Sequence, residues 1–200
     1  MASPSDDLPD RISACRICAG QFAATVTAHQ PRPVLRVSPT ARILIAGQAP
    51  GARVHASGLP FDDPSGDRLR DWLELDRETF YDESHVAILP AGFCYPGRHA
   101  RGGDLPPRPE CAPMWHRRLT SHMPDIELTL LAGQYAQAHY LGRRRCHSLT
   151  ATVAAWRDYL PEYLPLPHPS WRNTAWLRKN PWFEAELLPV LREKVLALVA

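Results

Sequence analysis

Short apolar runs that alternate with amphipathic stretches are the main pattern of this chain. Four runs of four or five residues each are predicted to be buried strands and occupy residues 43–46, 86–89, 128–132 and 163–166. The stretches between them carry apolar residues at helical spacing. Strands that alternate with helices are typical of a parallel sheet covered on both faces. The pattern therefore predicts an α/β fold, a three-layer α/β/α sandwich around a central, mostly parallel four-stranded sheet.

Four helices are predicted outside these strands, over residues 67–75, 109–119, 133–141 and 182–199. The first of them places Leu69, Trp72 and Leu73 on one stripe, as in a helix that packs against a sheet. Ser65 precedes this helix and is a candidate for its N-terminal cap, because a serine oxygen can accept hydrogen bonds from the first free amides.

The composition is that of an ordinary globular protein of 200 residues, of which 44% are hydrophobic and 22% are charged. This length suffices for one domain with a buried core, which we assign to residues 11–200, after a flexible N-terminus over residues 1–10. The apolar runs are far shorter than the roughly 20 residues that cross a bilayer. The first residues are polar and acidic, unlike a secretory signal. We therefore expect a cytoplasmic monomer with no membrane role.

Basic residues are clustered locally, although the net charge of +2 is too small to identify a polyanionic partner. Residues 143–145 are three consecutive arginines, and Arg172, Arg178 and Lys179 lie in a stretch without an acid. Arginine suits phosphate through its fork of donors, so phosphate contact is one interpretation of these clusters. A solvated face is the other.

A tight polar loop follows the first apolar run. Residues 47–51 read Gly-Gln-Ala-Pro-Gly; the two glycines permit a sharp turn and close approach of a ligand, and the proline stiffens the loop. Further along, Gly-Leu-Pro-Phe at residues 58–61 places Phe61 among turn-forming residues. This ring could stack on a base or pack in the core. Taken alone, the first loop could be no more than a strand-to-helix turn.

A second polar loop follows the last apolar run and reads His-Pro-Ser at residues 168–170. His168 lies between Pro167 and Pro169, which restrict its backbone at the end of a strand. Ligands of open α/β sheets bind outside the carboxyl ends of the strands. Both loops are therefore candidates for one site, whereas a packed or surface histidine is the alternative for His168.

Five cysteines in a reducing compartment are candidates for ligands, catalytic groups or buried thiols. Cys15 and Cys18 form one pair, and sixteen residues separate Cys94 from Cys111. Four thiolates in two pairs suit either a 4Fe-4S cluster or zinc. The alternative is that no metal is bound and these are ordinary thiols. Cys146 fits no ligand position and is predicted to be a free thiol.

These segments, in this order and at similar intervals, resemble the family-four uracil-DNA glycosylases. In that family the first motif is Gly-Glu-Ala-Pro-Gly, a Gly-x-Pro-Phe segment follows, and the last motif is His-Pro-Ser. The similarity runs from about Cys15 to the C-terminal helix. It implies the uracil-DNA glycosylase fold, single- or double-stranded DNA as the partner, and a 4Fe-4S cluster. The residues it implies as cluster ligands are Cys15, Cys18, Cys94 and Cys111.

The resemblance also implies a DNA repair reaction, the hydrolysis of the N-glycosidic bond of uracil or another deaminated base. The base would be flipped into a pocket, where the backbone of Gly47 and Ala49 binds its edge and Phe61 stacks on it. His168 would donate a hydrogen bond to the developing anion on the leaving base. The residues implied to contact DNA are Ser170, Trp171 and Arg172.

Two positions depart from the family pattern. Gln48 replaces the acid of the first motif, and an amide can orient a water but cannot act as a base. Pro90 replaces the asparagine that reads uracil, and one lost bidentate contact is worth about 1–3 kcal/mol of discrimination. Asp62 or Asp63 could supply the missing carboxylate, or could simply form the turn and cap the following helix.

Other functions remain open for a chain with these departures. It could be a catalytically weak or inactive DNA-binding module of the same fold. It could also be a small-molecule N-glycosidase or nucleotide-binding protein that uses this fold. A glycosylase branch that traps its product covalently carries a histidine in a basic loop, where this chain has His99. The motif around that histidine and the glutamate of the first motif are absent here.

Overall fold

Four strands form the central sheet of the computed structural model, which describes residues 8–200. They are β1 (Ile43–Ala46), β2 (Val86–Ile88), β3 (Leu128–Ala132) and β4 (Tyr163–Leu166). Every neighbouring pair is parallel, in the order β2-β1-β3-β4. The predicted α/β fold with a four-stranded sheet is confirmed. The first seven residues of the predicted flexible N-terminus lie outside the described residues.

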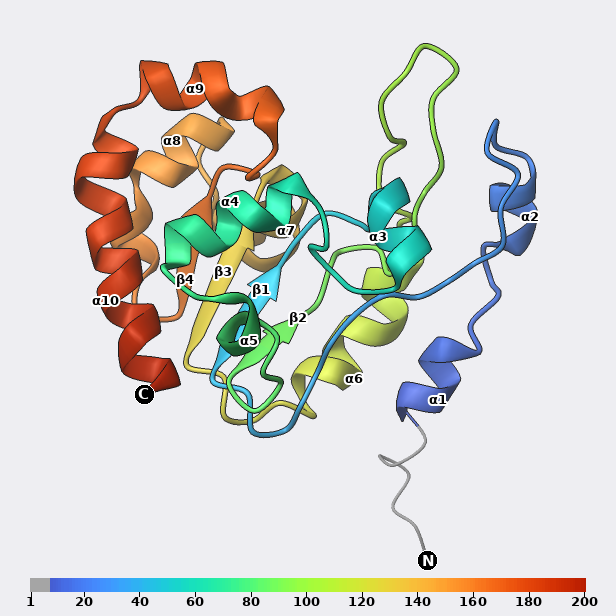
Figure 1. The fold of residues 1–200 in the computed structure, drawn as a ribbon, viewed down its shortest axis with the longest axis horizontal. Helices are drawn as coiled ribbons and strands as arrows, with labels where there is room; N and C mark the ends of the chain where they lie inside the picture. The colour runs from blue at the N-terminus through green and yellow to red at the C-terminus, as the bar shows by residue number, and fades with distance from the viewer. Residues whose placement is uncertain (1–7) are drawn as a thin grey trace, which may run out of the picture.

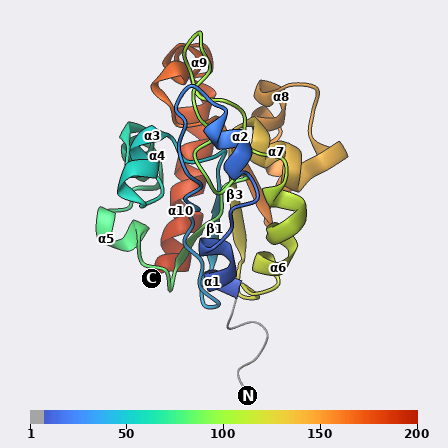
Figure 2. The same ribbon diagram turned by 90° about the vertical axis from the view of Figure 1, so that its right-hand side faces the viewer.

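Helices cover both faces of the sheet, which makes three layers (Figures 1 and 2). Alternate residues of the strands, such as Ile43 and Ile45 of β1, face a core shared with α4, α5 and α10. Leu44 faces the opposite core, formed with α1, η1 and α6, and Leu131 packs against α7. The bounds of these helices are α1 (Leu8–Ser13), α4 (Pro64–Leu73), α5 (Arg77–Phe80), η1 (Ala112–His116), α6 (Arg117–Thr120), α7 (Gln134–Leu141) and α10 (Leu188–Val199).

Helix α4 begins at Pro64, three residues before the predicted start, and its cap is Asp63 rather than Ser65. The Asp63 carboxylate accepts a hydrogen bond from the Gly66 amide at 2.9 Å. Proline suits the first helical position because its φ is already helical and no amide is left without a partner. Since Pro64 fixes the first turn, the capping position falls on the residue before it. The expectation that Ser65 caps this helix is wrong.

Two of the predicted helices contain a stretch of wider π-helix. The helix expected over residues 109–119 starts at Ala112 as η1 and continues as α6, and the one expected over residues 182–199 is η5 (Phe183–Leu187) followed by α10. Pro113 lies in the first of these stretches, and Pro189 lies two residues after the end of the second. A proline has no amide for the α-helical ladder, which favours a local change of hydrogen-bond spacing.

Several short helices were not predicted, because each is too short to show an amphipathic period. None of the helices within residues 8–200 is long and apolar enough to cross a membrane. The remaining helical segments are α2 (Ala19–Ala23), α3 (Ala52–Ser57), η2 (Gly142–Arg144), α8 (Leu149–Ala154), η3 (Trp156–Tyr159), η4 (Trp171–Asn173) and α9 (Thr174–Lys179).

Candidate functional site

The first motif follows β1 directly and is fastened to the segment after β2. Its Gly47 carbonyl accepts a hydrogen bond from the Ala91 amide at 3.0 Å, and its Gln48 carbonyl accepts one from the Gly92 amide at 3.0 Å. The Gln48 side chain is half-buried, and within residues 8–200 its amide makes no hydrogen bond. The motif is therefore held by its backbone, and the Gln48 side chain is free to bind a water or a ligand.

Phe61 lies against this motif, as its predicted role requires. A Cβ placed on Gly47 would be 3.4 Å from Cζ of Phe61, which is van der Waals contact, so the ring lies directly against the backbone of the first motif. Phe61 has a left-handed φ of 57°, and its carbonyl occupies the space that a Gly66 side chain would fill. The ring also meets Phe80 edge to face, with centroids 6.3 Å apart. Phe61 is thus both a partner of the core and a wall of the first motif.

His168 sits beyond β4 and against the end of β3. A Cβ on Gly133 would be 3.1 Å from Cβ of His168, so the absence of a side chain at Gly133 makes room for the histidine. Its carbonyl accepts a hydrogen bond from Asn173 Nδ2 at 2.7 Å. Its Nδ1 accepts one from the Ser170 amide at 3.2 Å. Backbone and ring are both fixed by the loop that follows.

Burial lowers the pKa of His168, and the negative charge of Asp63 opposes this in part. The ring is therefore neutral at pH 7. Because Nδ1 is occupied as an acceptor, the neutral ring carries its proton on Nε2. This leaves one N–H donor, on Nε2, a group of the kind that can stabilise an anion.

Asp63 connects the two motifs. One carboxylate oxygen caps α4, and the other, Oδ2, lies 3.9 Å from the position of a Cβ on Gly51, the last residue of the first motif. Its charge also acts on His168. Asp62 is directed elsewhere, because it forms an ion pair with Arg77 at 2.8 Å that lowers the pKa of its carboxyl group. Of the two acids, Asp63 is the one beside the motifs.

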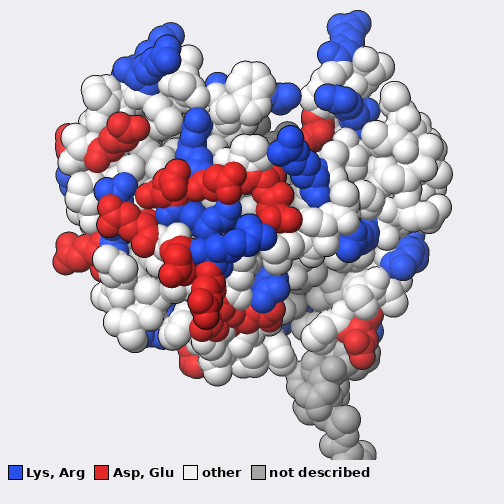
Figure 3. Space-filling view, in the orientation of Figure 1, with Lys and Arg blue, Asp and Glu red and all other residues white. Residues whose placement is uncertain are grey.

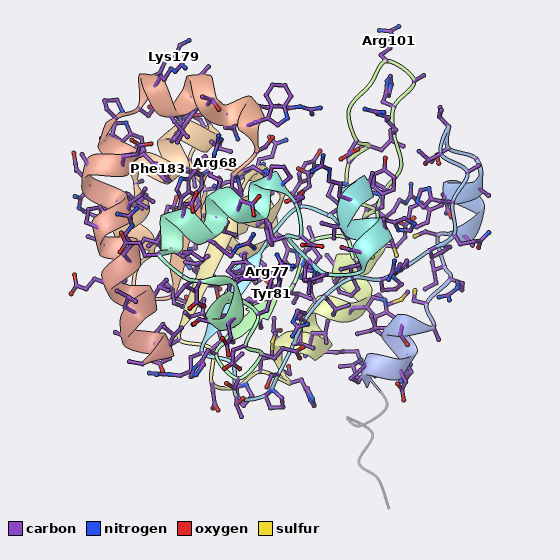
Figure 4. The ribbon with its side chains drawn as sticks, in the orientation of Figure 1. Arg68, Arg77, Tyr81, Arg101, Lys179 and Phe183 are labelled. Carbon is purple, nitrogen blue, oxygen red and sulfur yellow. The ribbon has the colours of Figure 1, made fainter. Side chains whose placement is uncertain are left out.

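A second carboxylate, which the sequence did not reveal, also borders the first motif. Asp104 Oδ2 lies 3.8 Å from the Cβ position on Gly51. Asp104 belongs to a loop over residues 97–105 that closes by an antiparallel pairing with Arg98. Figure 1 shows this loop projecting at the upper right, and Figure 4 places Arg101 at its tip. The only signal in the sequence is the glycine pair at residues 102–103, which permits the tight return.

The loop after His168 carries the residues expected to contact DNA. Trp171 is 72% exposed, and the Arg172 guanidinium lies 5.8 Å above its ring. Arg172 also reaches the loop over residues 97–105, since its Nη1 would be 3.6 Å from a Cβ on Gly103. Arg68 of α4 braces this segment by donating to the Ser170 carbonyl at 2.9 Å (Figure 4). The two loops thus meet beside the motifs.

Charge is unevenly distributed around this region. In Figure 3 acidic side chains form a band across the middle of the face that carries α4, basic side chains lie directly below this band, and further basic side chains lie along the upper edge. Figure 4 identifies Arg101 and Lys179 at the two ends of that edge. The upper edge also carries the loop over residues 97–105 and α9 (Figure 1). The basic side chains of the upper edge would attract a polyanion to that edge.

The four cysteines of the expected ligand set lie near one another. Cys18 and Cys94 pack together with Phe22, and Cys15 and Cys111 border the neighbouring core. Burial, and less strongly the thiols around it, raises the pKa of Cys94 to about 12. As the side chains stand, no three metal-binding side chains within residues 8–200 form a group that could hold a metal ion.

Pro90, one of the two positions that depart from the family pattern, and His99 both have structural roles. Pro90 is buried, and its carbonyl accepts a hydrogen bond from His116 Nε2 at 3.0 Å. His99 lies in the loop over residues 97–105, and its Nδ1 accepts a hydrogen bond from the Arg101 amide at 3.1 Å. This hydrogen bond helps to shape the tip of that loop. All five cysteines, Cys146 among them, are free thiols.

One comparison with known proteins bears on this site. The model of the family described as the uracil DNA glycosylase superfamily matches residues 35–192. The matched range contains the first motif, His168 and both loops that meet beside them. Cys15 and Cys18 lie before it.

Proposed function

The chain belongs to the uracil-DNA glycosylase superfamily, and from this premise we propose that it is a DNA glycosylase that removes uracil or another deaminated base. The observation that carries the proposal is the position of Asp63 between the first motif and His168. A neutral histidine that can donate from Nε2 and a carboxylate near it are the two groups that hydrolysis of an N-glycosidic bond needs.

In the proposed reaction the damaged base is turned out of the DNA strand and stacks on Phe61. As the bond from C1′ of the sugar to the base breaks, its electron pair goes to the base, where the Nε2–H of His168 hydrogen-bonds the developing anion. Asp63 takes a proton from the water whose oxygen bonds to C1′. Gln48 orients that water through its amide. The base anion then takes up a proton from the solvent, and Asp63 releases its proton to the solvent. The products are an abasic site and the neutral free base.

The proposed base specificity follows from the absence of a side-chain amide at Pro90. With no side-chain amide at this position, uracil is read without the bidentate contact of the family pattern. Backbone groups of Gly47 and Ala49 remain to bind the edge of the base. We therefore propose that the pocket accepts uracil and other deaminated bases with less discrimination than a site with that asparagine.

The DNA strand is proposed to lie along the edge where the two loops meet. Trp171 is the exposed ring that would wedge into the stack of bases, while Ser170 and Arg172 contact phosphates. Arg101 adds a cation at the tip of the opposite loop. In this arrangement DNA avoids the acidic band over α4.

A panel of oligonucleotides tests this function. Single-stranded and duplex substrates that contain uracil, hypoxanthine or xanthine are incubated with excess enzyme, and abasic sites are cleaved with alkali. We expect strand scission for at least one of these bases and none for undamaged DNA. Intact strands throughout the panel would rule out the glycosylase.

A DNA-binding module without turnover is the second candidate, and Gln48 in place of the acid is the observation that favours it. Such a module binds DNA in a salt-dependent way but yields no abasic product. Replacement of Arg172 by alanine would then weaken binding equally for all sequences, since a phosphate contact carries no sequence information. Any abasic product that His168→Ala abolishes would exclude this candidate.

We also propose that Cys15, Cys18, Cys94 and Cys111 hold a 4Fe-4S cluster. Four soft thiolates suit this group, and burial that disfavours free thiolates is offset when iron neutralises their charge. The cluster would fasten the segment between α1 and α2 to the start of η1. It has no part in the proposed chemistry at His168.

The cluster is tested by metal content. Protein purified without oxygen is expected to be brown and to contain iron and acid-labile sulfide in equal amounts, and Cys94→Ala to lose both. A colourless protein that contains zinc would show that the four cysteines bind zinc and not a 4Fe-4S cluster. A colourless protein without metal would contradict it. Cys146→Ala is the matched control and should retain the colour.

A further inference from the structure

A cavity of about 430 Å³ lies between α7 and α8, outside the site described above. Figure 2 shows the segment that joins these helices projecting from the right-hand side of the molecule. Arg143, Arg145 and His147 of this segment line the cavity together with Gln137 of α7. Its volume falls in the range of about 300–1,000 Å³ that is typical of small-molecule sites.

The three consecutive arginines at residues 143–145 lie in two different environments. Arg144 packs its guanidinium over Tyr163 at 5.7 Å and over Tyr159 at 6.0 Å. Arg143 and Arg145 instead line the cavity, and within the described residues neither forms an ion pair or hydrogen bond. No carboxylate is among the residues that line it. Two unpaired guanidinium groups without a nearby acid attract an anion, and phosphate matches their planar fork of donors.

The inner wall of the cavity is polar, and hydrogen bonds fix the position of its side chains. Gln137 is only 2% exposed, and its Nε2 donates to the Leu166 carbonyl at 2.9 Å. Its Oε1 is left as an acceptor with no partner among residues 8–200. Thr152 Oγ1 accepts the Cys146 amide at 3.1 Å and donates to the Ser148 carbonyl at 2.9 Å, so the loop wall is braced. An inorganic anion has no donor for the Gln137 Oε1 acceptor, whereas a sugar hydroxyl or a base amine can donate to it.

The cavity is also a neighbour of the proposed active site. Leu166, whose carbonyl accepts the hydrogen bond from Gln137, is the last residue of β4. Only Pro167 separates it from His168. Gln134, which lines the cavity, directly follows Gly133, the residue that touches His168. The two sites therefore share the carboxyl ends of β3 and β4.

We propose that this cavity binds a nucleotide, with its phosphate on Arg143 and Arg145 and its sugar or base toward Gln137. Two sources share this chemistry: a nucleotide of the bound DNA strand, away from the damaged one, and a free nucleotide. The inference does not depend on base excision, because binding to undamaged nucleic acid or free nucleotide reports on the cavity alone.

The test compares Arg143→Ala/Arg145→Ala with Arg117→Ala/Arg118→Ala, which removes the same charge from α6. One arm measures the affinity of each protein for an undamaged, labelled single strand over a range of salt concentrations. If the strand supplies the nucleotide, the cavity variant binds about tenfold more weakly, and the slope of log K against log salt falls by about 1–2. The α6 variant should bind as the wild type does.

The other arm titrates the wild type and both variants with 5′-dAMP and with deoxyadenosine in a calorimeter. If the source is a free nucleotide, 5′-dAMP binds to the wild type at one site and deoxyadenosine does not bind. Of the two alanine variants, only the cavity variant then shows no heat of 5′-dAMP binding. Arg143→Lys/Arg145→Lys is expected to recover part of the lost binding, since it restores the charge but not the fork. Equal behaviour of the cavity and α6 variants in both arms would overturn the proposal.

Discussion

Asp63 shows how one side chain can serve the fold and the site together. Its Oδ1 caps α4 through the Gly66 amide, and its Oδ2 remains beside Gly51, where its charge also acts on His168. The sequence offered helix capping and a compensating acid as competing interpretations of Asp62 and Asp63. Capping is confirmed for Asp63, and the same geometry leaves its Oδ2 beside the first motif, 3.9 Å from the Cβ position on Gly51. Catalysis by Asp63 stays a prediction.

Replacement of Asp63 by asparagine separates the two functions. Asparagine caps helices as well as aspartate does, so the free energy of unfolding should change little. Loss of the base should lower the single-turnover excision rate by about 10²-fold or more. Asp62→Asn, which breaks the ion pair with Arg77, is the control and should retain activity. If Asp63→Asn excises at the wild-type rate, Gln48 and water alone support the reaction, and Asp63 is only a cap.

At the residue scale, sequence patterns located the motif residues but not all of their neighbours. Phe61 and His168 could be recognised because each is enclosed by glycine or proline in a short segment. Asp104 could not, since its contact with the first motif is made by a loop that is distant in the sequence. Gly133 could not be recognised either, because its role is to leave space for His168. Such contacts depend on which strand ends become neighbours.

At the scale of elements, strands were predicted more closely than helices. A buried strand in a parallel sheet is a continuous apolar run, and its ends are visible in the sequence. The start of α4 was placed too late because Pro64 and Asp63, not Ser65, set its first turn. The π-helical stretches η1 and η5 were missed because a small change of hydrogen-bond spacing leaves the hydrophobic period almost unchanged.

The buried histidine at the end of η1, His116, makes the stability of the fold depend on pH. His116 is 2% exposed and stacks on Phe93, and burial, together with His139, lowers its pKa from 6.5 to about 4. The unfolded chain therefore binds more protons than the native one between these two pH values. The neutral ring contributes stability above the unfolded pKa, and this contribution is lost as the pH falls from 6.5 toward about 4.

Denaturant titrations at several pH values measure this effect. We expect the wild type to lose on the order of 3 kcal/mol of unfolding free energy through His116 across that window. His116→Gln retains a donor for the Pro90 carbonyl but does not titrate, so its stability should fall less steeply with acid. His122→Gln serves as the control for removal of a histidine. Parallel pH profiles for wild type and His116→Gln would show that another group is responsible.

At the scale of the whole molecule, the parallel sheet explains why distant segments converge. All four strands run in one direction, so the loops after β1, β3 and β4 emerge at one edge. The location of the site could be predicted from this rule once the strands were identified. The basic edge and the acidic band over α4 could not, because a net charge of +2 does not reveal how charges are distributed in space.

Excision of a base from DNA at the edge that carries His168 is the proposed activity of the whole molecule. The most direct measurement is release of the free base, quantified by mass spectrometry in single-turnover reactions of wild type and His168→Ala with the best substrate of the oligonucleotide panel. We expect the wild type to yield a free base and an abasic strand in equal amounts. His168→Ala should excise about 10²–10³-fold more slowly at unchanged DNA affinity. Base release that does not depend on His168, or DNA binding without any released base, would contradict this proposal.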